Sequence, residues 1–360
     1  MFRKIVISVM ILLLITPTFS TVSVFASLSV SAESAILIDA TTGEIIYEKN
    51  AYQQRSMAST TKIMTALIAL SDFDVTAEYE MTDEMVMVEG TSLGLKSGDK
   101  ISLLDLVKGM MMTSGNDSAN AIAISLCGST EKFADLMNKK ADEIGMKNSS
   151  FVTPSGLDAD EHYTTSYDMA LLTKEALLNA TFREIVSSKS LTIAFGNPKQ
   201  NHTVYNHNRL LKSYDGAIGV KTGFTKKSGR CLVSAAKRDG VTLIAVTLKA
   251  PDDWNDHKNM LDYGFEKADS ISFNKTEHRQ ALVGGEKDSV LVKSDRYKFE
   301  FSGSFHQSKL NKTVILERFS YCPIKKGDIL GKIVYTYNGK EIYSSDLVAC
   351  EDVAFKNKTD

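Results

Sequence analysis

The sequence is poor in the residues from which metal and disulfide sites are built. Its 360 residues include four cysteines and six histidines, with no His-Glu-x-x-His motif and no cysteine spacing typical of a zinc site. These absences argue against a zinc carboxypeptidase, and we expect no metal and no other cofactor. Cys127 and Cys231 lie in apolar stretches, which predicts buried free thiols. For Cys322 and Cys350 the sequence leaves a disulfide bond and two free thiols equally open.

An excess of charge and a membrane-spanning apolar run are also missing. The formal net charge of −2 gives no reason to expect nucleic acid as a partner. The apolar run at residues 5–15 is too short to span a bilayer, and Pro17 closes it. Arg3 and Lys4 precede this run and a small-residue site ending at Ala26 follows it. Residues 1–26 are therefore predicted to be a secretory signal peptide, and the protein to be exported.

Three short motifs occur in a fixed order along the chain: Ser59-Thr60-Thr61-Lys62, Ser114-Gly115-Asn116 and Lys221-Thr222-Gly223. A Ser-x-x-Lys pattern alone says little, because about two are expected by chance in a chain of this composition. A Ser-Gly-Asn or a Lys-Thr-Gly is expected only about 0.1 times, and each occurs once. The ordered set is typical of an active-serine site for acyl transfer.

Local context selects the nucleophile among the Ser-x-x-Lys patterns, which begin at Ser59, Ser97, Ser129, Ser234 and Ser272. The chemistry needs a serine and a lysine one helical turn apart on the same face. Ser59 fits, since it opens an apolar stretch with helical spacing. Ser97 lies in a glycine-rich loop, Ser129 is placed to cap a helix, and Ser234 and Ser272 lie in extended segments.

Each of the other two motifs also has a purely structural explanation. Ser114-Gly115-Asn116 follows a long apolar run and could simply end a helix. Lys221-Thr222-Gly223 could be a strand end with a glycine bulge. The order of the three motifs favours the catalytic interpretation, because a helix, a loop and an edge strand are the elements that the chemistry needs.

With these motifs the chain resembles the low-molecular-mass penicillin-binding proteins that act as serine-type D-alanyl-D-alanine carboxypeptidases. The resemblance extends to a predicted hairpin at 35–47, the stretches at 153–158 and 206–211, and a trailing β-rich part. It implies an α/β (α+β) fold like that of penicillin-binding proteins and β-lactamases, with an antiparallel sheet flanked by helices. It also implies a small C-terminal all-β domain that resembles a sandwich.

The resemblance implies a role for each matching residue. Ser59 would be the nucleophile, Lys62 its base, Ser114 a proton relay to the leaving amine, and Asn116 a partner of Lys62 and of the substrate amide. Lys221 and Thr222 would bind the terminal carboxylate of a peptidoglycan stem peptide. Gly223 would leave room for the substrate beside the edge strand, and the backbone N–H groups of Ser59 and Phe224 would form the oxyanion hole. β-Lactams would acylate Ser59 as covalent inhibitors.

Two features depart from the family pattern. The tail at 351–360 is polar and charged, whereas many members end in an amphipathic helix that lies on the membrane. Membrane attachment is therefore open between a released enzyme, an uncleaved signal anchor and docking through the terminal domain. Phe224 stands where members often carry a polar side chain, which could change the acyl donors that fit.

The pattern along the chain predicts two folded domains. Residues 27–269 mix hairpins with helices and are expected to form the catalytic domain, with a closing helix at 252–267. Residues 270–350 show only short extended runs and are expected to form a small antiparallel sandwich, followed by the polar tail at 351–360. A hydrophobic content of 43% is sufficient for two cores.

Other functions of the same motifs stay open at this level. A class A-like β-lactamase would need a loop glutamate for deacylation, followed shortly by Leu-Asn; the interval between the second and third motifs offers Glu161, which lacks that pattern. A D,D-endopeptidase would use identical residues. A catalytically silent protein that binds the wall or senses penicillin is the non-enzymatic alternative.

Overall fold

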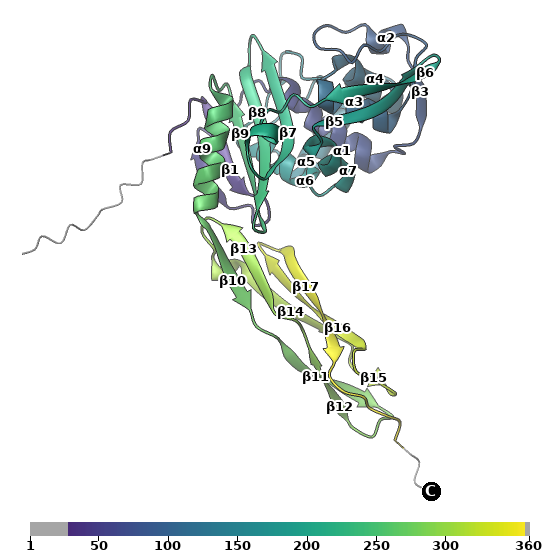
Figure 1. Ribbon diagram of the computed structural model, residues 1–360, viewed down its shortest axis with the longest axis vertical. Helices are drawn as coiled ribbons and strands as arrows, with labels where there is room; N and C mark the ends of the chain where they lie inside the picture. The colour runs from purple at the N-terminus through teal and green to yellow at the C-terminus, as the bar shows by residue number, and fades with distance from the viewer. Residues whose placement is uncertain (1–27, 357–360) are drawn as a thin grey trace, which may run out of the picture.

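The computed structural model describes residues 28–356. It has a mixed α/β part, followed by an elongated part made of strands (Figure 1). The predicted signal peptide lies outside the described residues, as do the last four residues of the tail. None of the helices in the described range is both long enough and apolar enough to cross a membrane.

A five-stranded antiparallel sheet organises the α/β part, with the strand order β2-β1-β9-β8-β7. Its strands are β1 (Ser34–Asp39), β2 (Ile45–Lys49), β7 (Ala217–Thr225), β8 (Gly229–Arg238) and β9 (Val241–Leu248). The sheet thus joins the predicted N-terminal hairpin to three strands from far along the chain. The Lys-Thr-Gly strand β7 lies at its edge.

The strand β1 shows why the sheet is covered on both faces. Ile36 and Ile38 belong to the large core cluster, whereas Ala35 and Leu37 belong to a second cluster on the opposite face, as the two-residue period of a strand requires. Helix α9 (Asp253–Glu266), close to the predicted 252–267, covers the second cluster with Met260 and Leu261.

The remaining helices of the α/β part come from the segment between β2 and β7, and most of them contribute to the large core. They are η1 (Ala58–Thr61), α1 (Lys62–Asp72), α2 (Asp83–Val86), α3 (Leu103–Thr113), α4 (Asn116–Cys127), α5 (Thr130–Ile144), α6 (Ser166–Ala176), α7 (Ala180–Ser187) and α8 (Leu210–Ser213). Helices α1 and α3 pack beside each other, which brings the first two motifs together.

A second, four-stranded sheet in the α/β part was not predicted. Its order is β3-β4-β5-β6, formed by β3 (Glu78–Glu80), β4 (Lys100–Ser102), β5 (Ser190–Gly196) and β6 (Lys199–Tyr205). Strands β3 and β4 have three residues each, which is too short for an alternating pattern to be recognised.

The C-terminal part contains a two-stranded and a six-stranded sheet (Figure 1). The first pairs β10 (Ala268–Phe273) with β13 (Tyr297–Ser302). The second has the order β14-β16-β17-β12-β11-β15, with β11 (Glu277–Val283), β12 (Ser289–Lys293), β14 (Leu310–Leu316), β15 (Ser320–Tyr321), β16 (Ile329–Tyr337) and β17 (Lys340–Ala349); η2 (Gln307–Lys309) precedes β14. The expectation of a purely antiparallel sandwich is wrong at one point, because the two-residue β15 pairs with β11 in parallel.

The cysteines all carry free thiols. Cys231 is buried as expected, but Cys127 is only half-buried, because it ends helix α4. Cys322 and Cys350 are not bridged in this structure.

Polar contacts around the β1–β2 turn hold the two parts of the chain together. The buried carboxylate of Asp39 accepts hydrogen bonds from the backbone N–H groups of Thr41, Thr42 and Ser302, each at 2.8 Å. The Ser302 hydroxyl donates to the carbonyl of Gly264 at the end of α9, at 2.5 Å. Lys309 and Glu44 form an ion pair nearby. The C-terminal part is therefore attached to the sheet through groups that are mostly removed from water.

We expect Asp39→Asn to lower the free energy of unfolding by about 1–3 kcal/mol. An amide has one acceptor oxygen, so at least one of the buried N–H groups would face the amide nitrogen and lose its partner. Urea unfolding measures the effect. Asp215→Asn is the matched control, because the Asp215 side chain is 95% exposed and its change should stay within about 0.5 kcal/mol. Equal stability of both variants would contradict the prediction.

Candidate active site

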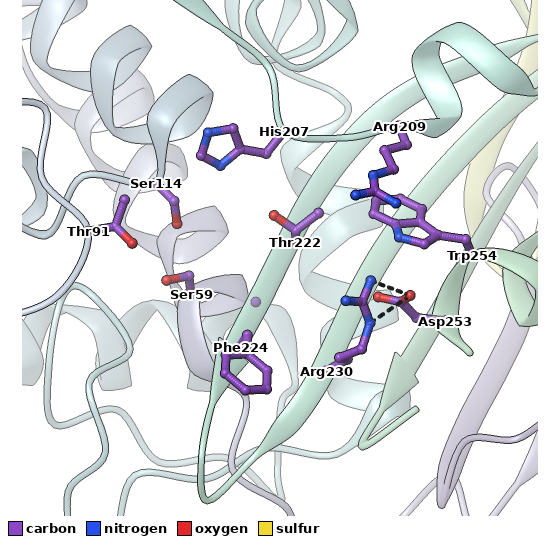
Figure 2. A pocket seen from close by; sticks show the side chains of 11 residues that line it. Ser59, Thr91, Ser114, His207, Arg209, Thr222, Phe224, Arg230, Asp253 and Trp254 are labelled. Atoms are coloured by element: carbon purple, nitrogen blue, oxygen red, sulfur yellow. Dashed lines mark hydrogen bonds and ion pairs between the residues drawn. The ribbon is translucent and has the colours of Figure 1, made fainter. Parts of the chain in front are cut away.

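The structure brings the eight predicted site residues together where η1, the α3–α4 turn and the edge strand β7 meet. Ser59 lies in η1 and Lys62 begins α1. Ser114 ends α3 and Asn116 begins α4. The remaining four, Lys221, Thr222, Gly223 and Phe224, follow one another along β7. Figure 2 shows Ser59, Ser114, Thr222 and Phe224 around one cavity of about 310 Å³.

The Lys62 amine lies at the centre of this arrangement. Its Nζ is 3.0 Å from Ser59 Oγ, 2.7 Å from Asn116 Oδ1 and 2.5 Å from the Ser155 carbonyl oxygen. The Asn116 amide nitrogen donates to the carbonyl of Glu89 at 2.7 Å, which fixes the orientation of the amide with its oxygen toward Lys62. The amine therefore faces two carbonyl-type acceptors and one hydroxyl.

Burial lowers the affinity of the Lys62 amine for its proton. The side chain is fully buried, and loss of solvation, reinforced by the positive charge of Lys221, holds the pKa of Lys62 well below its ordinary value. The carboxylate of Asp117 acts in the opposite direction and is the weaker influence. The neutral amine thus becomes accessible at a pH at which an exposed lysine is charged.

Lys221 and Ser114 form a second buried pair. Lys221 Nζ donates to Ser114 Oγ at 3.0 Å and to the Thr222 carbonyl at 2.9 Å. Burial lowers the pKa of Lys221 to about 7. Ser114 has a left-handed backbone, with φ 64° and ψ 28°, where it ends α3. It therefore ends a helix, as the structural explanation of its motif required, and it also faces the cavity.

Two glycines allow close backbone approach to the turn that carries Ser59. A Cβ on Gly156 would lie 2.0 Å from the Ala58 carbonyl oxygen, and one on Gly223 would lie 3.1 Å from the backbone nitrogens of Ser59 and Thr60. Ala58 itself has a φ of 48°, which is unusual for a residue with a side chain. From the sequence we expected Gly223 to leave room for a substrate. In the structure the absence of a side chain at Gly223 also lets β7 approach η1.

The other Ser-x-x-Lys serines lie elsewhere in the fold. Ser97 is exposed in a loop, and Ser129 caps α5 by accepting a hydrogen bond from the backbone of Lys132. Ser234 is buried in β8, and Ser272 lies in β10. The predicted capping role of Ser129 is confirmed.

Sequence analysis missed the groups that support the site from behind. Asp117 accepts hydrogen bonds from the backbone of Leu93 and Leu95, at 2.8 and 3.1 Å, and from Ser92 Oγ. It thereby holds the loop whose Glu89 carbonyl orients Asn116. The carbonyls of Glu89 and Ser155 leave no mark in a sequence, because any residue has one. Asp117 directly follows the Ser-Gly-Asn motif, and this position was the one signal in the sequence that pointed to it.

His162 is a second supporting residue without a sequence signal. Its Nδ1 accepts a hydrogen bond from the Val152 backbone at 2.9 Å, so its Nε2 carries the proton and donates to Thr61 Oγ1, also at 2.9 Å. The Thr61 hydroxyl donates in turn to the Ala58 carbonyl at 2.8 Å. Burial lowers the pKa of His162 to about 4. The neutral ring thus links the loop at 152–157 to the turn of Ser59.

The far wall of the cavity is polar and aromatic (Figure 2). Arg209 and Arg230 each place a guanidinium 5.9 Å from the ring centre of Trp254, and Arg230 pairs with Asp253 at 2.7 Å. His207 and Arg209 come from the stretch at 206–211, to which the sequence analysis gave no role. Within residues 28–356, no group of three or more His, Cys, Asp or Glu side chains is arranged to hold a metal ion.

Comparison with known proteins agrees with this geometry. Residues 20–252 match the family model of D-alanyl-D-alanine carboxypeptidases. The chain belongs to this family. Residues 265–354 match a second family model, that of the C-terminal domain of penicillin-binding protein 5.

Individual members of the D-alanyl-D-alanine carboxypeptidase family match over most of the chain. The carboxypeptidase DacF of Bacillus subtilis is 32% identical over 91% of this chain and 87% of its own length. DacC of Escherichia coli is 32% identical over 95% and 89%. The crystal structure of DacD from Francisella tularensis has a TM-score of 0.65 at 27% identity and covers 92% of this chain and 95% of its own. The predicted family and fold are thereby confirmed.

We expect Gly156→Ala to slow acylation of the protein by a fluorescent penicillin at least tenfold, on the order of 1.4 kcal/mol. The new methyl group would push the Ala58 carbonyl and displace Ser59. Gly128→Ala is the matched control, because Gly128 has nearly the same φ, 82° against 85°, and open space around it. Both variants share the backbone strain, and only Gly156→Ala adds the collision. Equal acylation rates would show that the close approach does not position Ser59.

Proposed function

We propose that the protein is a serine D,D-carboxypeptidase that removes the C-terminal D-alanine from peptidoglycan stem pentapeptides through an acyl-enzyme on Ser59. The observation that carries the proposal is the contact between Ser59 Oγ and a buried, readily deprotonated Lys62 amine. A serine hydroxyl is a weak nucleophile unless a base accepts its proton, and this pair supplies both.

The hydrogen bonds of Lys62 explain how the base is aimed. A neutral amine has two N–H groups and one lone pair. The two N–H groups donate to the pure acceptors, Asn116 Oδ1 and the Ser155 carbonyl, so the lone pair is left for the Ser59 hydroxyl. Ser59 then attacks the carbonyl carbon of the peptide bond between the two D-alanines while its proton moves to Lys62 Nζ.

We assign the remaining residues to the charges that form in this step. The backbone N–H groups of Ser59 and Phe224 stabilise the oxyanion. Ser114, whose oxygen accepts from Lys221, donates its hydroxyl proton to the departing amine and takes up the proton that Lys62 received from Ser59, so that Lys62 is neutral again. Cationic Lys221 and the Thr222 hydroxyl bind the carboxylate of the terminal D-alanine. Asn116 holds Lys62 and the substrate amide.

Release of the shortened peptide repeats the same chemistry with water. Free D-alanine leaves first, and a water molecule takes its place beside the ester. Lys62 accepts a proton from this water as it attacks the ester carbonyl, and the proton returns to Ser59 Oγ as the peptide acid departs. β-Lactams would acylate the same oxygen.

We place this reaction outside the cytoplasmic membrane, because the substrate is part of the cell wall and residues 1–26 are predicted to be an export signal. We further propose a catalytic domain at 27–269 and a β domain at 270–350, followed by the tail at 351–360. The end of α9 at Glu266 favours a boundary near this point, but β10 (Ala268–Phe273) begins before residue 270. The start of the tail belongs to the β fold, because Val353 is buried in its core and pairs with Ile324.

The first test is Ser59→Ala, which should abolish both D-alanine release and covalent labelling by penicillin, because Ser59 supplies the hydroxyl that contacts the Lys62 amine. Mass spectrometry of a pentapeptide-bearing muropeptide, scored for loss of one alanine, is the measurement. Ser97→Ala is the matched control, since Ser97 also begins a Ser-x-x-Lys pattern but lies exposed in a loop. It should retain both activities.

The alternatives give different results in the same assay. Labelling of Ser59→Ala would refute the nucleophile. If penicillin labels the wild-type protein but no alanine is lost, the protein would instead be an endopeptidase that acts on cross-linked peptides. Rapid turnover of penicillin would indicate a β-lactamase, and a protein that labels slowly and turns over no substrate would be a silent binder.

The pH dependence of kcat/KM should be bell-shaped. The rising limb follows loss of the proton from Lys62, whose lowered pKa makes the base available below the ordinary lysine range. The falling limb should lie near pH 7, because Lys221, with a pKa of about 7, must stay charged to bind the carboxylate. Lys221→Arg keeps the charge at all these pH values, so it should remove the falling limb. If the falling limb persists in this variant, it must arise from a group other than Lys221.

A further inference from the structure

A second cavity, of about 410 Å³, lies where the α/β part meets the β16–β17 hairpin of the C-terminal part. Its wall comes from the β1–β2 turn, the end of α6, helix α7 and strands β7 to β9. The hairpin adds Lys340 and Glu341. None of its lining residues lines the catalytic cavity. Its volume falls within the range of ligand sites, roughly 300–1,000 Å³.

The charged groups of this cavity are almost all cationic: Lys174, Arg183, Lys237 and Lys340. None of the four forms an ion pair with a carboxylate in the described part of the chain. Lys174 instead donates to the Thr41 carbonyl at 3.1 Å, and Arg183 to the Leu177 and Leu178 carbonyls at 2.6 and 3.0 Å. Glu341 is the one acidic lining residue, and it is exposed.

Two of these cations oppose each other across the junction. Lys174 is half-buried on α6, and Lys340 lies on the hairpin. Burial lowers the pKa of Lys174, and the charge of Lys340 lowers it further, while the carboxylates of Asp39 and Glu175 act in the opposite direction. An anion between them would replace this repulsion with two attractions, and it would also restore the solvation that burial removes from Lys174.

The rest of the wall is apolar. Ala40, Leu177 and Ile218 form it together with Leu178, whose side chain is 69% exposed although it is a leucine. An inorganic anion would satisfy the lysines and leave this surface in contact with water. A ligand that contacts both the lysines and the apolar wall must carry an apolar segment beside its charged group.

We propose that this cavity binds an anionic amphiphile, namely a phosphate or carboxylate head on a short apolar chain. The head lies between Lys174 and Lys340, with Lys237 beside it, and the chain covers Leu177, Leu178 and Ile218. Because the lysines belong to both parts of the chain, the bound ligand ties the β16–β17 hairpin to the α/β part.

Calorimetric titration of the full mature chain with octyl phosphate tests the proposal, with inorganic phosphate and the uncharged octyl glucoside as comparison ligands. Octyl phosphate should bind at least tenfold more tightly than either, since only it meets both the charge and the apolar wall. Lys174→Gln and Lys340→Gln should each weaken its binding about tenfold. Lys212→Gln is the matched control, because Lys212 is exposed and does not line the cavity. Penicillin labelling of Ser59 should remain unchanged in all of them, which shows that they are folded.

Leu178→Glu provides an independent test. The new carboxylate would pair with the cavity lysines, so this variant should unfold at a higher temperature than Leu178→Gln and should no longer bind octyl phosphate. Binding of octyl phosphate that is equal in wild type and in the Lys174→Gln/Lys340→Gln double variant would overturn the proposal. Octyl glucoside that binds as tightly as octyl phosphate would also overturn the proposal, because the site would then recognise only the apolar chain.

Phosphatidylglycerol vesicles distinguish the two sources of such a head. Cosedimentation that is lost in Lys340→Gln would mean that the head belongs to a lipid within a bilayer. Binding of octyl phosphate without cosedimentation would mean a free amphiphile. Both outcomes support the site, and absence of binding in both arms refutes it.

Discussion

The burial of a lysine amine against two carbonyl oxygens is the constraint on which the site depends. An ammonium group is costly to remove from water, so complete burial favours the neutral form of Lys62. The acceptors that remain, Asn116 Oδ1 and the Ser155 carbonyl, then decide where its lone pair points. Asn116 depends in turn on the Glu89 carbonyl, and the Glu89 loop depends on Asp117. The direction of the Lys62 lone pair therefore depends on a series of hydrogen bonds that runs from Asp117 through the Glu89 loop to Asn116.

The topology explains how such distant segments can meet. The sheet takes its strands from both ends of the α/β part, and the helices between them fill one face. This leaves β7 as an edge strand facing η1, with the α3–α4 turn beside it. Lys221 crosses from the edge strand to Ser114 and connects the sheet to the helical layer. The two lysines, whose charges repel each other, are therefore held by different layers of the fold.

The sequence predicted what side chains determine and missed what the backbone supplies. The three motifs, the closing helix α9 and the edge position of β7 could be predicted, because catalytic side chains and the apolar spacing of a long helix leave a pattern. The carbonyls of Ser155 and Glu89 could not, since every residue has a carbonyl. Strands β3, β4 and β15 were too short to show a period, and the parallel pairing of β15 depends on tertiary contacts alone. His162 is recognisable only once Thr61 lies beside it.

Gly156 and Gly223 pack against the backbone of the turn that carries Ser59. The cavity therefore has two regions that differ in how freely their residues can be substituted. Neither glycine can gain a side chain without moving the nucleophile's backbone, so the floor admits almost no change. Phe224 also lines the cavity, but it is 67% exposed, so a different side chain there extends into solvent. Changes in the peptides and drugs that fit are therefore expected at such exposed positions, while the backbone beneath Ser59 stays fixed.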